Sequence, residues 1–291
     1  MPKRSKKEKQ EPNIVVFLVE GESDKIALEL PLSNLIDMKF PEYQVRFLLQ
    51  ERMVNKTGDE LEDQDMDEED ADEEEEFIED VEYVYGGDIT TSSYVTPSNI
   101  ESKITRRFIL PAIKSEGIYP KKIAKVIHIV DLDGAYISKN SVVPYSPERQ
   151  ENEKVFYNGE KGTIETADVD AIRERNERKQ KNLEHLLNLP DHKIKIKTKS
   201  IPYEVYYFSS NLDHFINNNA NVESRKKFLA DKFLRTYGFD IEKFTSFFFQ
   251  DKRSIGHMGY NESWDFIKED SNSVKRYTNI DCLIRTLLVD E

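Results

Sequence analysis

Two short apolar runs in the chain each end in acidic residues followed by glycine. The first run, NIVVFLV at 13–19, is rich in β-branched residues, and the second, AKVIHIV at 124–130, has the same character. Continuous runs of this kind are typical of strands buried on both faces of a parallel sheet, because a half-exposed strand alternates apolar and polar residues. The pattern therefore predicts two central strands of one sheet.

The rest of the pattern predicts helices and outer strands around these two strands. Apolar residues at helical spacing predict a helix that starts near Asp24 and ends or kinks at Pro31. A second helix is expected over 97–115, with a kink at Pro111. Further strands are expected at 43–49, 81–85 and 193–208, a charged helix at 169–187 and a short helix at 212–216. These elements predict an α/β fold with a mainly parallel sheet flanked by helices.

Composition divides the chain into a tail, an α/β domain and an extension. Residues 1–12 are expected to be a disordered basic tail, 13–216 the α/β domain and 217–291 a helical C-terminal extension. The domain carries an acidic insert at about 55–82 and a polar excursion at about 135–168. The insert is expected to be disordered, because its dense like charge repels itself and offers little apolar surface to bury.

The formal net charge of −14 taken alone argues against a polyanionic partner. However, 17 acidic residues fall between Asp59 and Glu82, in a segment without Lys or Arg, and the rest of the chain carries +3. The acidity therefore belongs to the insert, and a nucleic-acid partner stays open. The insert is interpreted as a solvated linker, with the alternative that it mimics nucleic acid and covers a basic groove.

The single cysteine, Cys282, gives no internal disulfide framework and no Cys-rich zinc module. The apolar run after the basic N-terminus, residues 14–19, is six residues long. A secretory signal needs roughly 7–15 apolar residues and a membrane span about 20. We therefore expect a cytoplasmic protein that does not associate with a membrane.

Acidic residues follow both central strands, where the active sites of open α/β sheets gather. Glu20 follows the first strand, and Asp131 and Asp133 follow the second at i and i+2, on one face of an extended chain. Adjacent strands lie about 4.8 Å apart, so the three carboxylates would crowd together. Such carboxylates repel one another unless a cation joins them, and hard oxygen ligands select Mg²⁺ or Mn²⁺. The pattern predicts a metal site suited to phosphoryl transfer.

These residues lie in two motifs, VEGESD at 19–24 and VDLDG at 130–134, that resemble the signature motifs of the Toprim domain. The Toprim pattern is hydrophobics-Glu-Gly-x-x-Asp and then hydrophobics-Asp-x-Asp on a later strand, and both parts match in full. The resemblance implies a Rossmann-like fold in which Glu20 is general acid or base and Asp131 and Asp133 hold Mg²⁺. Asp24 corresponds to the Asp of the first motif. The motifs lie about 110 residues apart, farther than in compact Toprim domains, and the acidic insert accounts for much of the excess.

Several further residues are candidates for supporting roles. Asp213 follows the last predicted strand, where some Toprim nucleases carry another carboxylate, and is either a second metal ligand or an ordinary first-turn acid. His128 is expected to be a core histidine. Basic residues that either bind a phosphate backbone or belong to a protected edge strand and a solvated helix are Lys193, Lys195, Lys197, Lys199, Arg225 and Lys226. The four lysines occupy every second position from 193 to 199, which predicts that their side chains lie on one face of a strand.

The Toprim resemblance implies a Mg²⁺-dependent endonuclease that cleaves DNA or RNA, with tRNA among the candidates. The chain is similar to overcoming-lysogenization-defect nucleases and to the Toprim toxin effectors of anti-phage (antiviral) defence, whose partner is an ABC-type ATPase. The sequence has no Walker A pattern, so the ATPase would be another chain, and a homo-oligomer is a further expectation. Two alternatives stay open: a structured-RNA processing nuclease of the ribosomal RNA maturase type, and a non-catalytic Toprim-fold binding module.

Overall fold

The computed structural model describes residues 13–55, 81–85, 87–115, 117–146, 155–222 and 224–288, with the backbone alone for 51–55 and 81–85. Its centre is a five-stranded sheet in the order β2-β1-β5-β10-β9. The strands are β1 (Ile14–Val19), β2 (Gln44–Leu49), β5 (Ile123–Asp131), β9 (Lys193–Ile196) and β10 (Lys199–Phe208). The first four strands in that order are parallel, and β9 is antiparallel to β10. The α/β class predicted from the sequence is confirmed.

Strand register brings the acidic motifs to one edge of the sheet. Leu18 of β1 pairs with His128 of β5, and Phe208 of β10 pairs with Asp131. The carboxyl ends of β1, β5 and β10 are therefore adjacent. Both central strands form where the apolar runs predict them, because their side chains are buried on both faces of the sheet.

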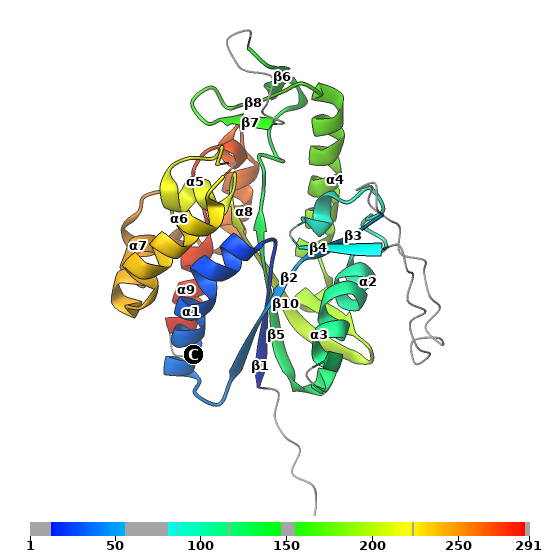
Figure 1. Ribbon diagram of the computed structural model, residues 1–291, viewed down its shortest axis with the longest axis vertical. Helices are drawn as coiled ribbons and strands as arrows, with labels where there is room; N and C mark the ends of the chain where they lie inside the picture. Colours follow the sequence, from blue (N-terminus) through cyan, green and yellow to red (C-terminus); the bar gives the residue numbers. More distant parts are fainter. Residues whose placement is uncertain are drawn as a thin grey trace, which may run out of the picture.

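Helices cover both faces of the sheet (Figure 1). On one face, Phe17 of the sheet shares a core with Leu28 and Phe244, and the helices there are α1 (Glu22–Lys39), α6 (Lys226–Phe233), α7 (Ile241–Gln250) and α9 (Ile280–Leu288). On the other face, Val126 shares a core with Ile104 and Leu183. The elements there are α2 (Ile100–Ile104), α3 (Leu110–Ser115), α4 (Val169–Leu187) and α8 (Tyr260–Lys268). The C-terminal part is helical, as predicted, and packs on the same sheet.

The two predicted proline effects have different outcomes. Pro31 does not end its helix, because α1 continues to Lys39 with Leu32 and Leu35 fully buried, and that burial outweighs the backbone hydrogen bond lost at proline. The helix predicted over 97–115 begins at Ile100 and contains a π-helical turn, η2 (Thr105–Ile109), directly before Pro111. A missing backbone donor and a π-turn are recognised causes of a helix kink.

The described parts of the polar excursion, 135–146 and 155–168, are folded, which was not predicted. They form a three-stranded sheet, β6-β8-β7, from β6 (Val142–Pro144), β7 (Val155–Asn158) and β8 (Thr163–Thr166). A separate two-stranded sheet pairs β4 (Val81–Tyr85), a predicted strand, with β3 (Glu51–Asn55), which was not predicted, in antiparallel orientation. The disorder predicted for residues 1–12 and for most of the insert falls on residues outside the described part. Among the residues described, every helix is too short or too polar to span a bilayer.

Candidate functional site

Glu20 joins the ends of the two central strands. It directly follows β1, and α1 begins two residues later after the extended N-cap Gly21, whose N–H donates to Asp24 Oδ2 at 2.8 Å. Glu20 Oε1 accepts a 2.9 Å hydrogen bond from the backbone N–H of Asp131 at the end of β5. This contact brings the two sequence motifs together, as predicted.

Three carboxylates from distant parts of the chain form an acidic cluster, defined here as Glu20, Asp88 and Asp133. Each offers an oxygen that lies within 4.8 Å of the oxygens of the other two. Their side chains keep only 14%, 7% and 22% of their accessible surface, respectively. Such close carboxylates are costly to bury without a compensating cation.

The ammonium group of Lys179, on α4, supplies that compensation. Its Nζ lies 2.6 Å from Asp88 Oδ2, 3.0 Å from Asp133 Oδ2 and 3.9 Å from Glu20 Oε1, and the side chain is fully buried. Lys179 Nζ also donates to the carbonyl oxygen of Asp131. Burial alone would lower the pKa of Lys179, but the carboxylates, Asp133 foremost, raise it well above its usual range. The cluster is therefore a cation-binding arrangement with an internal cation.

Asp133 has a backbone conformation that corrects the predicted geometry of its motif. Its φ is +51° and that of Gly134 is +66°, so the chain turns after β5 instead of staying extended. The prediction that Asp131 and Asp133 share one face of an extended strand is wrong for this reason. A non-glycine residue at positive φ is uncommon, although aspartate adopts this conformation more readily than most residues. A Cβ on Gly134 would lie 2.9 Å from Ile164 Cδ1, so this turn requires glycine.

Two further half-buried residues fix Asp133. The hydroxyl of Tyr157, on β7, donates to Asp133 Oδ1 at 2.9 Å, and Arg175 Nη2, on α4, donates to the Asp133 carbonyl at 3.0 Å. Burial alone would raise the pKa of Asp133, but Lys179 and Arg175 outweigh it and lower that pKa. Asp133 is therefore held in its charged form.

Glu20 has the opposite shift. Burial raises the pKa of Glu20 well above its usual range, Asp88 adds to this effect and Lys179 opposes it. One ammonium therefore does not compensate the whole cluster. A carboxyl group with a raised pKa can hold or release a proton near neutral pH, as a general acid or base requires.

A second group of carboxyl groups, called here the Asp24 group, consists of Asp24, Asp131 and Asp213. Asp24 and Asp213 are 8% and 4% exposed, and Asp131 Oδ1 accepts from the N–H of Leu212 at 3.0 Å. Burial raises the pKa of Asp24 to about 7, against its hydrogen bond from Gly21, and the charge of Asp213 adds to the rise. Burial, then Asp24 and Asp133, raise the pKa of Asp131. All five predicted carboxylates thus lie at one edge of the sheet.

The predicted basic residues fall into two separate places. Arg225 and Lys226 are exposed at the start of α6, and Lys226 Nζ lies 4.0 Å from Asp213 Oδ2, beside the Asp24 group. In contrast, β9 pairs with the opposite end of β10, so that Lys195 lies opposite Ser200 while Phe208 lies opposite Asp131. Eight residues of strand span about 26 Å, so the lysines of β9 are remote from the acidic cluster.

The four lysines at 193–199 do not share one strand face. β9 ends at Ile196, and Lys197 lies in a turn with φ of +53° before β10 begins at Lys199. The prediction of one lysine face is therefore wrong. Lys193 and Lys195 do alternate with buried Ile194 and Ile196, as in an edge strand whose outward side chains protect it from pairing.

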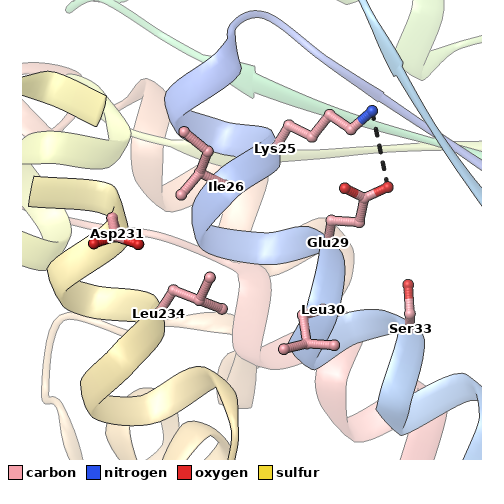
Figure 2. A pocket seen from close by; sticks show the side chains of 7 residues that line it. All are labelled: Lys25, Ile26, Glu29, Leu30, Ser33, Asp231 and Leu234. Carbon is pink, nitrogen blue, oxygen red and sulfur yellow. Dashed lines mark ion pairs between the residues drawn. The ribbon is translucent and has the colours of Figure 1, made fainter. Parts of the chain in front are cut away.

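A groove of about 480 Å³ lies between α1, α6 and the π-helical turn η6 (Leu234–Gly238) (Figure 2). In Figure 2 the apolar side chains of Ile26 and Leu234 lie between the two helices, whereas Lys25 and Glu29, joined by a 3.9 Å ion pair, project from the other side of α1. Its lining residues are Lys25, Ile26, Glu29, Leu30, Ser33, Asp231 and Leu234. They include no member of the acidic cluster or the Asp24 group, so the groove is separate from the candidate site.

Four residues of the site were not predicted from the sequence: Asp88, Tyr157, Arg175 and Lys179. Asp88 follows a predicted strand and two glycines, so an acid and a glycine lie just after a strand as in both motifs, but in the reverse order. Lys179 belongs to a polar series, Asn176, Lys179 and Asn182, on the buried face of α4. Polar residues on the core face of a helix are a detectable signal, because they must find partners there. His128 is fully buried and hydrogen-bonded, which confirms its prediction as a core histidine.

Comparison of this chain with protein-family models, with curated proteins and with solved structures found no match. The Toprim resemblance therefore stays a prediction that rests on the two motifs. Any function must be inferred from the motifs together with the geometry of the site.

Proposed function

We propose that this protein is a divalent-metal-dependent nuclease that cleaves nucleic-acid phosphodiester bonds at the acidic cluster. The observation that carries the proposal is the convergence of Glu20, Asp88 and Asp133, with oxygens within 4.8 Å of one another. Asp131 and the rest of the Asp24 group lie directly beside them, through the 2.9 Å contact between Glu20 and Asp131. Clustered carboxylates at the carboxyl edge of a parallel sheet are the arrangement expected of such an active site.

The donor atoms suit a hard divalent cation. All the candidate ligands are carboxylate oxygens, which Mg²⁺ and Mn²⁺ prefer over softer metals. Asp131 and Asp133 would hold the ion with Asp88, and Asp24 and Asp213 would be supporting ligands. When bound, such an ion polarises the phosphodiester and lowers the pKa of a coordinated water. Burial, with neighbouring carboxylates adding to it, raises the pKa values of Glu20 and Asp131, and Lys179 does not cancel this effect.

The chain's own residues supply the remaining chemistry. Glu20 would take a proton from the attacking water or give one to the leaving oxygen, which its raised pKa supports. Arg225 and Lys226 would bind substrate phosphates, since both are exposed and Lys226 lies 4.0 Å from Asp213. Tyr157 and Arg175 would hold Asp133 in place from the opposite side.

A biological setting follows from the Toprim resemblance alone. We propose that the chain is the effector of an anti-phage defence system in the cytoplasm, activated by an ABC-type ATPase on another chain. The absence of a Walker A pattern from the sequence is consistent with a separate ATPase. The proposal is an analogy between families, and it is tested separately from the cleavage chemistry.

One observation favours a second candidate function, a non-catalytic Toprim-fold binding module. The buried ammonium of Lys179 lies 2.6 Å and 3.0 Å from two of the three cluster carboxylates, so the cluster is partly neutralised without a metal. A protein that used the fold only for binding would need no more than this internal ion pair. The two candidates differ in whether a divalent cation changes the behaviour of the protein.

A cleavage assay tests the proposal. Plasmid, single-stranded DNA and bulk tRNA are incubated with the wild-type chain and Mg²⁺ or Mn²⁺, in parallel with Glu20→Ala, Asp131→Ala and the control Asp170→Asn. The side chain of Asp170 is 88% exposed and belongs to neither the acidic cluster nor the Asp24 group, so Asp170→Asn is expected to cleave like wild type. Loss of cleavage in the first two variants alone supports the nuclease. Equal cleavage by all four proteins refutes it, as does no cleavage by wild type even after the partner ATPase is added.

The same assay separates the settings. Cleavage of one defined structured RNA by the chain alone supports the maturase alternative. Cleavage that appears only after the partner ATPase is added supports the defence effector.

A further inference from the structure

A network of buried polar side chains, called here the polar network, connects the acidic cluster to the interior of the sheet. It runs from Tyr203 on β10 through His128 on β5 to Gln50, which directly follows β2, and it ends at the backbone of Ile89. Gln50 and His128 are fully buried and Tyr203 is 2% exposed. Buried polar groups at these positions cost stability unless every hydrogen bond is satisfied, so the geometry of the polar network is tightly specified.

The orientation of each side chain in the polar network follows from its hydrogen-bond partners. The N–H of Ile89 can only donate, and it lies 2.8 Å from Gln50 Oε1, so that atom is the amide oxygen. The amide NH₂ of Gln50 then faces His128 Nε2 at 2.9 Å, which must be an acceptor. The ring proton of His128 therefore sits on Nδ1 and is donated to the Tyr203 hydroxyl at 2.7 Å. Burial lowers the pKa of His128 to about 3, so the ring is neutral.

The last hydrogen bond of the polar network is made to the segment that carries Asp88. Asp88 caps the short helix η1 (Ile89–Thr91), accepting from the N–H of Thr90 through Oδ1 at 2.8 Å. That bond leaves Asp88 Oδ2 directed at Lys179. On its other side η1 is held by α4, through Asn182 Nδ2 to the Thr90 carbonyl at 2.9 Å. Gln50 is thus the side chain that holds η1 from the side of the sheet.

We propose that Gln50, oriented by His128 and Tyr203, is a positioning residue that sets the Asp88 carboxylate in the acidic cluster. It acts through Ile89 and does not touch the cluster itself. The proposal rests on the proposed function, because it assigns Gln50 a role toward a divalent ion held with the help of Asp88. Residues behind metal ligands typically change metal affinity by about 10–100-fold when they are replaced.

The first test measures Mn²⁺ affinity by electron paramagnetic resonance on the full chain. Gln50→Leu removes the acceptor for Ile89, and we expect its Mn²⁺ affinity to fall by about tenfold. Gln50→Glu keeps an acceptor for Ile89, and we expect it to bind Mn²⁺ nearly as tightly as wild type. Phe248, on α7, is fully buried in the core between that helix and the sheet. Phe248→Leu therefore controls for general destabilisation and should bind Mn²⁺ like wild type.

The second test reads the histidine directly and needs no metal. Nitrogen-15 NMR of the wild-type chain should show a neutral His128 ring protonated at Nδ1, with the signal assigned by its loss in His128→Phe. In Gln50→Glu the ring proton should move to Nε2, where the new carboxylate accepts it. A wild-type ring protonated at Nε2 would overturn the proposed orientation.

The outcomes separate this inference from the proposed function. If wild type binds Mn²⁺, Asp88→Asn binds it weakly and Gln50→Leu binds it like wild type, the positioning role is refuted while the metal site stands. If wild type binds no Mn²⁺, the proposed function fails and the positioning role toward that metal fails with it. Weak binding by Gln50→Leu that Gln50→Glu restores supports both.

Discussion

The Lys179 ammonium lies 2.6 Å from Asp88 Oδ2, and both side chains are buried. The two residues come from segments far apart in the sequence, so their contact exists only in the folded chain. Together with Asp133 and Glu20, this pair defines the electrostatics of the site.

Replacing Lys179 by methionine should destabilise the metal-free protein. The variant leaves buried carboxylates without their cation, and breaking a buried ion pair in this way costs about 3–5 kcal/mol. We expect added Mg²⁺ to stabilise Lys179→Met more than wild type, because the ion can replace the positive charge that the variant lacks. Unfolding by urea with and without Mg²⁺ measures both effects.

Lys181→Met is the matched control for this experiment. Lys181 is on the same helix and forms an exposed ion pair with Glu177 at 2.8 Å, so its loss should change the free energy of unfolding by less than about 1 kcal/mol. If Lys179→Met is as stable as Lys181→Met, the buried ion pair does not hold the cluster together.

The raised pKa of Asp24 predicts how stability depends on pH. Its pKa is about 7 in the folded protein, above the ordinary value of 3.8, so folding takes up a proton. This contribution is fully present below the unfolded pKa and is lost as pH rises through about 7. Without metal, the melting temperature of wild type should fall between pH 5 and pH 8, and that of Asp24→Asn should fall less. Equal slopes in the two proteins would show that Asp24 has no raised pKa.

The two basic regions should differ in nucleic-acid binding. Arg225→Gln with Lys226→Gln removes charges beside the Asp24 group, whereas Lys193→Gln with Lys195→Gln removes the same charge from the remote strand β9. For duplex DNA, two lost phosphate contacts lower the slope of log affinity against log salt by about 1.8. We expect this change for the first pair alone, measured by fluorescence anisotropy across a salt series. A larger effect from the second pair would place the substrate elsewhere.

The hydroxyl of Tyr157 should matter for the metal as well as for folding. Tyr157→Phe removes the 2.9 Å hydrogen bond to Asp133 Oδ1 and keeps the aromatic ring. Loss of one hydrogen bond to a charged group costs about 1.5–3 kcal/mol at most, while replacement of such a neighbour weakens metal binding by about tenfold. Calorimetric titration with Mn²⁺ and thermal unfolding of the same samples compare the two effects. Unchanged Mn²⁺ affinity would show that Tyr157 does not orient Asp133.

The sequence predicts the centre of this fold well because burial on both faces leaves a clear signal. The runs at 13–19 and 124–130 are largely apolar, and they form β1 and β5. The helix predicted at 169–187 has the bounds of α4, since it is rich in Arg, Glu, Lys and Leu, which favour a helix. Short strands such as β7 and β8 escape prediction, because four residues of mixed polarity carry almost no periodicity.

The candidate site was predicted only where its residues lie close to a strand end. Glu20, Asp131 and Asp133 follow buried strands, and strand order alone brings them together. Lys179 and Asp88 reach the site through the packing of α4 and η1, which are long-range contacts that local sequence does not encode. The turn at Asp133 was missed for a related reason, since a positive φ at aspartate depends on partners such as Tyr157 and Arg175.

The central claim is that the acidic cluster binds a divalent cation, and a Mn²⁺ titration followed by electron paramagnetic resonance tests it most directly. The titration compares wild type with Asp133→Asn and with Asp170→Asn, whose side chain is 88% exposed. The account predicts saturable Mn²⁺ binding by wild type and Asp170→Asn, with a loss of at least about tenfold in affinity for Asp133→Asn. Equal Mn²⁺ affinity in all three proteins, or no binding by wild type, would contradict it.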